Sequence, residues 1–123
     1  MSETFDTVDP IEMFEIDMSF HAALAQAAHN DALAEIHGTY LARLWRSRFL
    51  AAIQRRNRER VVDHHSRIVD ALRARDAAAI RAAIGVHLDR LAEDITRAVA
   101  REQETASTDA DRKENDETAA LRP

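Results

Sequence analysis

Apolar residues recur every three to four positions along most of the chain, which is the spacing of one face of an α-helix. The pattern predicts four helices, over residues of about 10–28, 31–53, 58–74 and 77–101. The charged stretch 54–60 between the second and third is interpreted as a linker or a solvated continuation. Gly38, inside the second helix, costs up to about 1 kcal/mol there and indicates close packing or a slight bend. The chain is therefore expected to be all-α.

Residues that favour helix starts stand at three of these boundaries. Asp9 precedes Pro10, and Glu12 occupies the position that a capping box requires. Asn30 and Asp76 are suitable N-caps for the second and fourth helices. These positions support the helix boundaries that the apolar spacing predicts.

The 123 residues are predicted to form one domain with two polar ends. Residues 1–9 are expected to be a flexible N-terminus, and residues 10–101 a single helical domain. Residues 102–123 lack apolar periodicity, and their polar composition is typical of a disordered tail. Hydrophobic residues make up 46% and charged residues 32% of the chain, a mixture typical of a globular protein.

Composition excludes several functions. The chain has no cysteine, so any metal must be held by histidines and carboxylates. No apolar run approaches the roughly 20 residues of a membrane span, and no signal-peptide core opens the chain, so a cytoplasmic location is expected. The net charge of -5 is unfavourable for contacts with phosphates, so this chain alone is not expected to bind DNA.

Four polar side chains stand on helix faces that are otherwise apolar. His65, His87 and Asp17 fall within the apolar stripes of the third, fourth and first helices. His21 follows Asp17 by four residues, so the two lie one turn apart on one surface. Around a cation, three imidazoles and a carboxylate satisfy one another, which predicts a metal site. The alternatives are hydrogen-bonded core histidines and an aspartate paired with an arginine, because an unpaired buried carboxylate is costly.

The remaining histidines are predicted to lie outside this site. His64 points about 100° away from His65 and is interpreted as a surface residue or a neighbour of the site. His29 is placed in a loop, and His37 on a helix surface.

Arginines of the second predicted helix are candidates for binding an anion. The neighbours of Arg48 are apolar, so its guanidinium is expected at the interior, where it could recognise a carboxylate. The alternative is a side chain that extends back to solvent. Arg43 is the second candidate. It is less inward, as is Arg46.

The same residues carry a family resemblance. The segment from Asp17 to Asn30, DMSFHAALAQAAHN, resembles the D-x-x-F-H-x-x-L-x-x-A-x-x-N signature of the FCD domain. The FCD domain is the C-terminal ligand-binding domain of FadR-type regulators in the GntR family. HSRIVDALRARD, from His65 to Asp76, resembles the next signature, and His87 falls where the family has its last ligand histidine. The match covers residues of about 12–95.

The resemblance implies an antiparallel helical bundle that holds one divalent ion, usually zinc or nickel. Carried over by motif, the ligands are Asp17, His21, His65 and His87. The family motif has Glu-His where this chain has His64-His65, and the downstream spacing assigns the ligand to His65. Family members bind small organic acids beside the metal, and the acid alters DNA binding by an attached winged-helix domain.

This sequence departs from the family at its start. No winged helix precedes Asp9, and there is no room for the two further helices with which the ligand domain usually begins. The chain is expected to be either a piece of a longer regulator or a free-standing truncated product. Missing helices would leave an apolar face exposed, and such faces usually find a partner, so a homodimer is expected.

The leading hypothesis is a metal-assisted sensor of a small carboxylate, and not an enzyme. A metal-dependent hydrolase is the first alternative, because such sites also activate water. The absence of an H-E-x-x-H arrangement weakens it. The second alternative is a structural or dimerising remnant with a stabilising metal.

Overall fold

The computed structural model describes residues 9–120, apart from the side chains of residues 55 and 56. This part of the chain contains five helices and no strand, which confirms the all-α class. The helices are α1 (Pro10–Ala27), α2 (Asp31–Arg43), α3 (Trp45–Ala52), α4 (Arg55–Arg73) and α5 (Ala77–Ala120).

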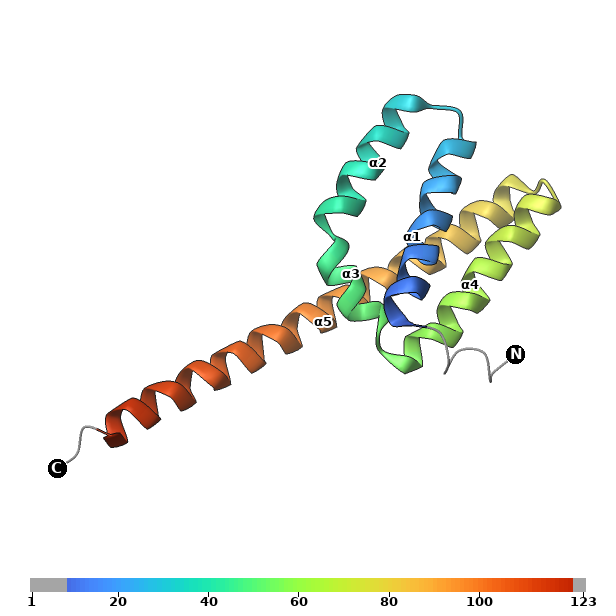
Figure 1. The fold of residues 1–123 in the computed structure, drawn as a ribbon. Coiled ribbons are helices and arrows are strands. Elements are labelled where there is room, and N and C mark those ends of the chain that lie inside the picture. The colour runs from blue at the N-terminus through green and yellow to red at the C-terminus, as the bar shows by residue number, and fades with distance from the viewer. Residues whose placement is uncertain (1–8, 121–123) are drawn as a thin grey trace.

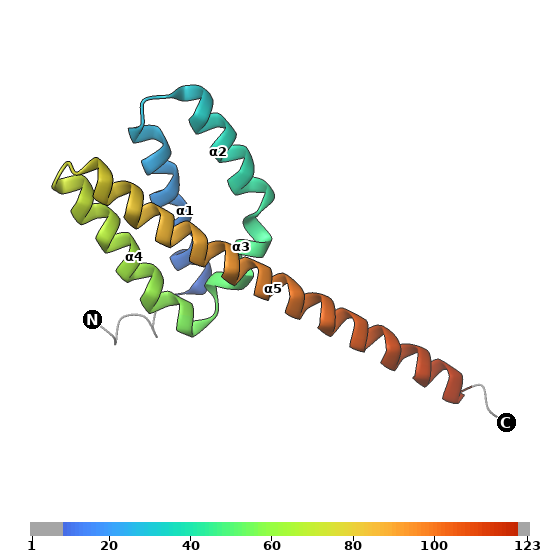
Figure 2. The ribbon, with the colours of Figure 1, turned by 180° about the vertical axis from the view of Figure 1, so that it is seen from behind.

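The helices form two antiparallel pairs joined by a short helix (Figure 1). α1 and α2 make the first pair, α4 and the first half of α5 make the second, and α3 connects them. Seen from behind, α5 crosses the bundle beside α4 and α3 and then extends away from it (Figure 2). Within the described residues, no helix combines the length and the apolar character needed to cross a membrane.

The predicted helix starts are confirmed by side-chain caps. Asp9 accepts a hydrogen bond from the backbone of Ile11, and Asn30 accepts one from Leu33, each at 3.1 Å. Asp76 accepts two, from the backbone N–H groups of residues 78 and 79, at 3.0 Å each. Each cap satisfies N–H groups that the helix itself leaves without partners. Of the predicted flexible N-terminus, residues 1–8 lie outside the described part.

The predicted second helix is in fact two helices. It breaks at Leu44, where φ is -93° and ψ is 3°. Beyond the break, Trp45 and Phe49 pack edge-on against Phe14 of α1, with ring centroids 5.2 and 5.5 Å away. Of the two interpretations of Gly38, close packing is wrong, because a Cβ built there would meet nothing within 4 Å.

The charged stretch 54–60 supplies the N-cap, Gln54, and the first residues of α4, so it belongs to that helix rather than forming a linker. Asn57 in this stretch is buried, and its side chain donates to the carbonyl of Ala51 at 2.9 Å. Arg60 donates to the Asn57 side chain at 2.9 Å and forms an ion pair with Asp94 of α5. This Asn57–Arg60–Asp94 network joins the end of α3 to α4 and α5.

The buried face of α4 differs from the predicted one. The apolar stripe of the predicted third helix, at positions 61, 65, 68 and 72, places Ile68 and Leu72 inward. Ile68 is 1% exposed, but Leu72 is 40% exposed. His64 and Ala71 are buried in its place. The reason is that α5 packs along α4 on that side, which a single-helix stripe does not reveal.

The predicted fourth helix ends near residue 101, but in the structure α5 continues to Ala120. Residues 103–120 are all exposed. This stretch contains no glycine or proline, so nothing in it interrupts a helix, although its aspartates and threonines are weaker helix formers than its alanines and glutamates. The last three residues of the predicted tail, 121–123, lie outside the described part.

Candidate metal centre

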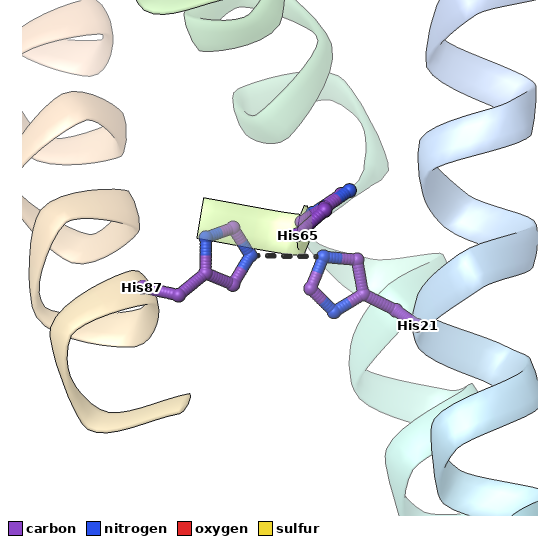
Figure 3. A group of neighbouring side chains, drawn as sticks. All are labelled: His21, His65 and His87. Carbon is purple, nitrogen blue, oxygen red and sulfur yellow. Dashed lines mark hydrogen bonds between the residues drawn. The ribbon is translucent and has the colours of Figure 1, made fainter. Parts of the chain in front are cut away.

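Three histidines from three helices converge at the centre of the bundle (Figure 3). His21 comes from α1, His65 from α4 and His87 from α5. The Nε2 atoms of His21 and His87 lie 3.2 Å apart, and one nitrogen from each of the three rings lies within 4.8 Å of the others. Residues far apart in the sequence thus place their donor atoms around one point.

Asp17 adds a carboxylate to the three imidazoles. It precedes His21 by one helical turn, and its Oδ1 lies 3.5 Å from Nε2 of His21. The same oxygen lies 3.3 Å from Nε2 of His65. Ligand atoms on a tetrahedral zinc ion, with bonds of about 2.0–2.1 Å, are separated by about 3.3 Å. The spacing of these donors therefore suits a small divalent ion.

Two of the converging atoms have no hydrogen-bond partner within the described residues. Asp17 Oδ1 and His65 Nε2 are both buried, and although they lie close together they are not aligned for a hydrogen bond. Buried polar atoms almost always have a partner, so an orphaned pair of this kind needs an explanation. A bound cation would satisfy both atoms, and the residues present fit such an ion.

The pKa shifts of His65, His87 and Asp17 also suit metal binding. Burial lowers the pKa of His65 and of His87 to about 4, and the neighbouring His21 adds to the effect in each case. Burial also acts to raise the pKa of Asp17, but His21, His65 and Arg48 outweigh it and hold that pKa below its ordinary value. Neutral imidazoles and an ionised carboxylate are the forms in which these groups bind metals.

Arg48 lies at the interior, as predicted, and does not extend to solvent. Its side chain on α3 is 6% exposed, and one terminal nitrogen lies 4.0 Å from Oδ2 of Asp17. Its Nε and that terminal nitrogen have no hydrogen-bond partner within residues 9–120. Burial lowers its pKa, against the opposing charge of Asp17. By contrast, Arg43 is exposed in the last turn of α2, and Arg46 is exposed in an ion pair with Glu102.

The structure places three further aromatic side chains beside the cluster. Of the two interpretations of His64, the surface position is wrong because the residue is buried, and the position beside the site is right because its ring meets that of His87 edge-on at 5.7 Å. Phe20 stacks on His65 at 4.1 Å. His37 is half-buried, and its pKa is lowered by burial and by the charges of His21 and Arg48. The family signature includes Phe20, and His64 occupies the position where the family motif has Glu; neither pattern by itself indicates that these side chains lie beside the cluster.

Comparison with known families agrees with this geometry. The FCD domain family matches residues 1–90 of the 123, and the chain belongs to that family. A domain of this family is the ligand-sensing part of a regulator. Neither the curated proteins nor the solved structures contain a match to this chain.

Proposed function

We propose that this domain senses a small carboxylate through a bound metal ion, as part of a GntR-type transcriptional regulator. Asp17, His21, His65 and His87 would hold the ion, and zinc or nickel suits a site made mainly of imidazoles. The observation that carries the proposal is the pair of orphaned buried atoms, Asp17 Oδ1 and His65 Nε2. When bound, the ion would supply a positive charge, and an acid could bind to it directly only if the ion accepts a fifth ligand beyond the four protein side chains.

Charge supports an anion as the sensed molecule. A divalent ion with one carboxylate and three neutral imidazoles keeps a net charge of about +1, and the Arg48 guanidinium adds a second positive charge. The unpartnered N–H groups of Arg48 are suited to a carboxylate, which a planar guanidinium can bind through two hydrogen bonds. The interior of the bundle therefore favours a small organic acid.

The space beside the cluster limits the size of that acid. A groove of about 200 Å³ lies between α1 and α4, with Asp17 and His65 among its lining residues. Most of the remaining lining is apolar, including Met13, Phe20 and Val61. Arg58 also lines the groove, whereas Arg48 is not among its lining residues. Pockets for drug-sized ligands are typically about 300–1,000 Å³. The groove thus suits a molecule of only a few carbon atoms, and we propose that the domain acts by binding it rather than by catalysis.

Metal analysis tests the core of the proposal. Protein purified without an affinity-tag metal, stripped with chelator and dialysed against zinc or nickel, is expected to retain about one ion per chain. His65→Ala and His87→Ala should lose that ion, because each removes a ligand. His29→Ala is the matched control, since His29 is exposed at the turn between α1 and α2. Wild-type protein that retains no ion would refute the site.

A further inference from the structure

The groove between the first halves of α1 and α4 has apolar walls that are only partly covered. Its lining includes Met13 and Ile16 of α1 and Val61 and Val62 of α4, and Pro10, the first residue of α1, also lines it. Ile16 is more than half exposed, and Val62 is 36% exposed. Because burial of apolar surface is favourable, an apolar side chain that packed on these walls would stabilise the protein.

The described part of the chain begins beside this groove. Asp9 is the N-cap of α1, and its side chain accepts a hydrogen bond from the backbone N–H of Ile11 at 3.1 Å. Val8 stands immediately before this cap, and Met13 is the fourth residue of the helix. These are the two positions of a hydrophobic staple, in which the residue before the cap packs against the fourth helical residue and sets the direction of the entering chain. Because Met13 lines the groove, a staple at these positions directs the preceding residues toward it.

The segment before the staple has an apolar side chain that can reach the groove. Five residue steps separate Phe5 from Pro10, and they span at most about 17 Å. Ile16 lies six residues beyond Pro10, which is about 9 Å along the axis of α1. Phe5 can therefore reach the middle of the groove and leave enough chain for the reversal of direction at the cap.

The charge of the segment also suits the groove. Glu3 and Asp6 stand on either side of Phe5, and the segment contains no lysine or arginine. Arg58 of α4 lines the groove and is half-buried, so it offers a positive charge to an acidic segment. Asp17, which also lines the groove, lies against the histidine cluster. An acidic segment that contains a phenylalanine is thus complementary to the groove in polarity and in charge.

We propose that residues 3–8 fold back over the groove as a strap, with Phe5 packed between Ile16 and Val62. The strap covers the groove of its own chain, because the short span from Phe5 to Pro10 keeps it at the start of its own α1. Its docking uses neither a metal ion nor an acid. The strap would also restrict the entry of the acid proposed above, and that consequence alone rests on the proposed function.

Thiol accessibility in the full, metal-free chain tests the strap, because the protein has no cysteine of its own. Val62→Cys places a thiol in the groove, and Leu72→Cys places a control thiol on the same helix, about 15 Å further along its axis. The two positions are matched in exposed fraction, at 36% and 40%. The thiol at position 62 should react with dithionitrobenzoate at least about tenfold more slowly than the thiol at position 72, a factor that burial of a phenylalanine side chain supports.

Phe5→Ser isolates the contribution of the phenylalanine. In this background the thiol at position 62 should react about tenfold faster than with Phe5 present, whereas the rate at position 72 should not change. Ile11→Ser is the matched control, since Ile11 is exposed at the start of α1 but is not among the residues that line the groove. It should leave the thiol at position 62 protected. Circular dichroism verifies that the variants remain helical.

Nuclear magnetic resonance of the unmodified chain gives a second measurement that needs no substitution. Nuclear Overhauser contacts are expected between the ring of Phe5 and the methyl groups of Ile16 and Val62. The absence of these contacts, or a rate at position 62 that does not depend on Phe5, would overturn the strap. Protection that disappears on dilution would place the segment of a second copy in the groove and would overturn it as well.

Discussion

The bundle contains two buried polar clusters that differ in how well they are satisfied. In the Asn57–Arg60–Asp94 network, the Asn57 amide donates to a backbone carbonyl and accepts from Arg60, which is paired in turn with Asp94. In the histidine cluster, Asp17 Oδ1 and His65 Nε2 are within reach of each other but form no hydrogen bond, and Arg48 has N–H groups without a partner.

This contrast is the basis on which we propose a binding role for the histidine cluster and a structural role for the Asn57–Arg60–Asp94 network. Both clusters join α4 to α5, and both lie in the interior, so burial alone does not distinguish them. A network whose members satisfy one another needs nothing further. A cluster with several orphaned atoms bears a desolvation cost that only an additional group can offset. The predictions that follow test whether the two clusters respond differently to the same perturbations.

The largest expected effect is the response of the histidine cluster to metal. Zinc at a thousand times its dissociation constant should stabilise the folded protein by about 4 kcal/mol, because the ion binds the folded state. For a domain of this size, that corresponds to a rise in melting temperature of more than about 10 °C. His87→Ala should abolish the rise. Differential scanning calorimetry with and without zinc measures it, and a rise unchanged in His87→Ala would contradict the role of the cluster.

The second largest expected effect is a loss of stability when the Asn57–Arg60–Asp94 network is broken. Asp94→Ala should destabilise the fold by about 3 kcal/mol, because it leaves Arg60 and its partners without the buried carboxylate. The loss should be the same in zinc-treated and metal-free protein. Asp89→Ala, at an exposed position of the same helix, is the control and should change stability by less than about 0.5 kcal/mol. Urea unfolding measures the free energy of unfolding of both variants. A loss of stability that appears only with zinc would show that the two clusters are coupled and would contradict this prediction.

The smallest effect concerns the acid. Citrate, lactate-like hydroxy acids or simple dicarboxylates should stabilise the zinc-treated protein more than the metal-free protein. Arg48→Met should retain the metal but weaken acid binding by about 1.5–3 kcal/mol, the range for a hydrogen bond to a charged group. Thermal-shift titrations measure the difference.

Arg43→Met is the control for this experiment, because Arg43 is exposed. If Arg48→Met binds the acid normally and Arg43→Met does not, the acid is held by Arg43 instead. Equal stabilisation with and without metal would exclude binding through the ion.

Local signals in the sequence were sufficient for the helices and their starts. The caps at Asp9, Asn30 and Asp76 act through backbone groups within three residues, so the sequence pattern contains all the necessary information. The break at Leu44 could not be predicted in this way. It accompanies the packing of Trp45 and Phe49 against Phe14, a residue about thirty positions earlier.

Helical spacing in the sequence was also sufficient to predict the four residues of the candidate site, but not their buried neighbour His64. Helical spacing indicated that Asp17, His21, His65 and His87 face inward, and the structure brings all four together. Their use as metal ligands stays a prediction. The burial of His64 was missed because it depends on α5 packing against that side of α4, and a stripe within one helix carries no information about its neighbour.

The length of α5 has a mechanical consequence. The helix is continuous from His87, whose ring is in the cluster, to Ala120 at the exposed end. At a rise of about 1.5 Å per residue, these two positions are about 50 Å apart along a single rod. By simple leverage over that length, a tilt of about 5° at the cluster moves the tip by about 4 Å. A displacement too small to detect at the histidines is therefore magnified at the far end, where it is readily measured.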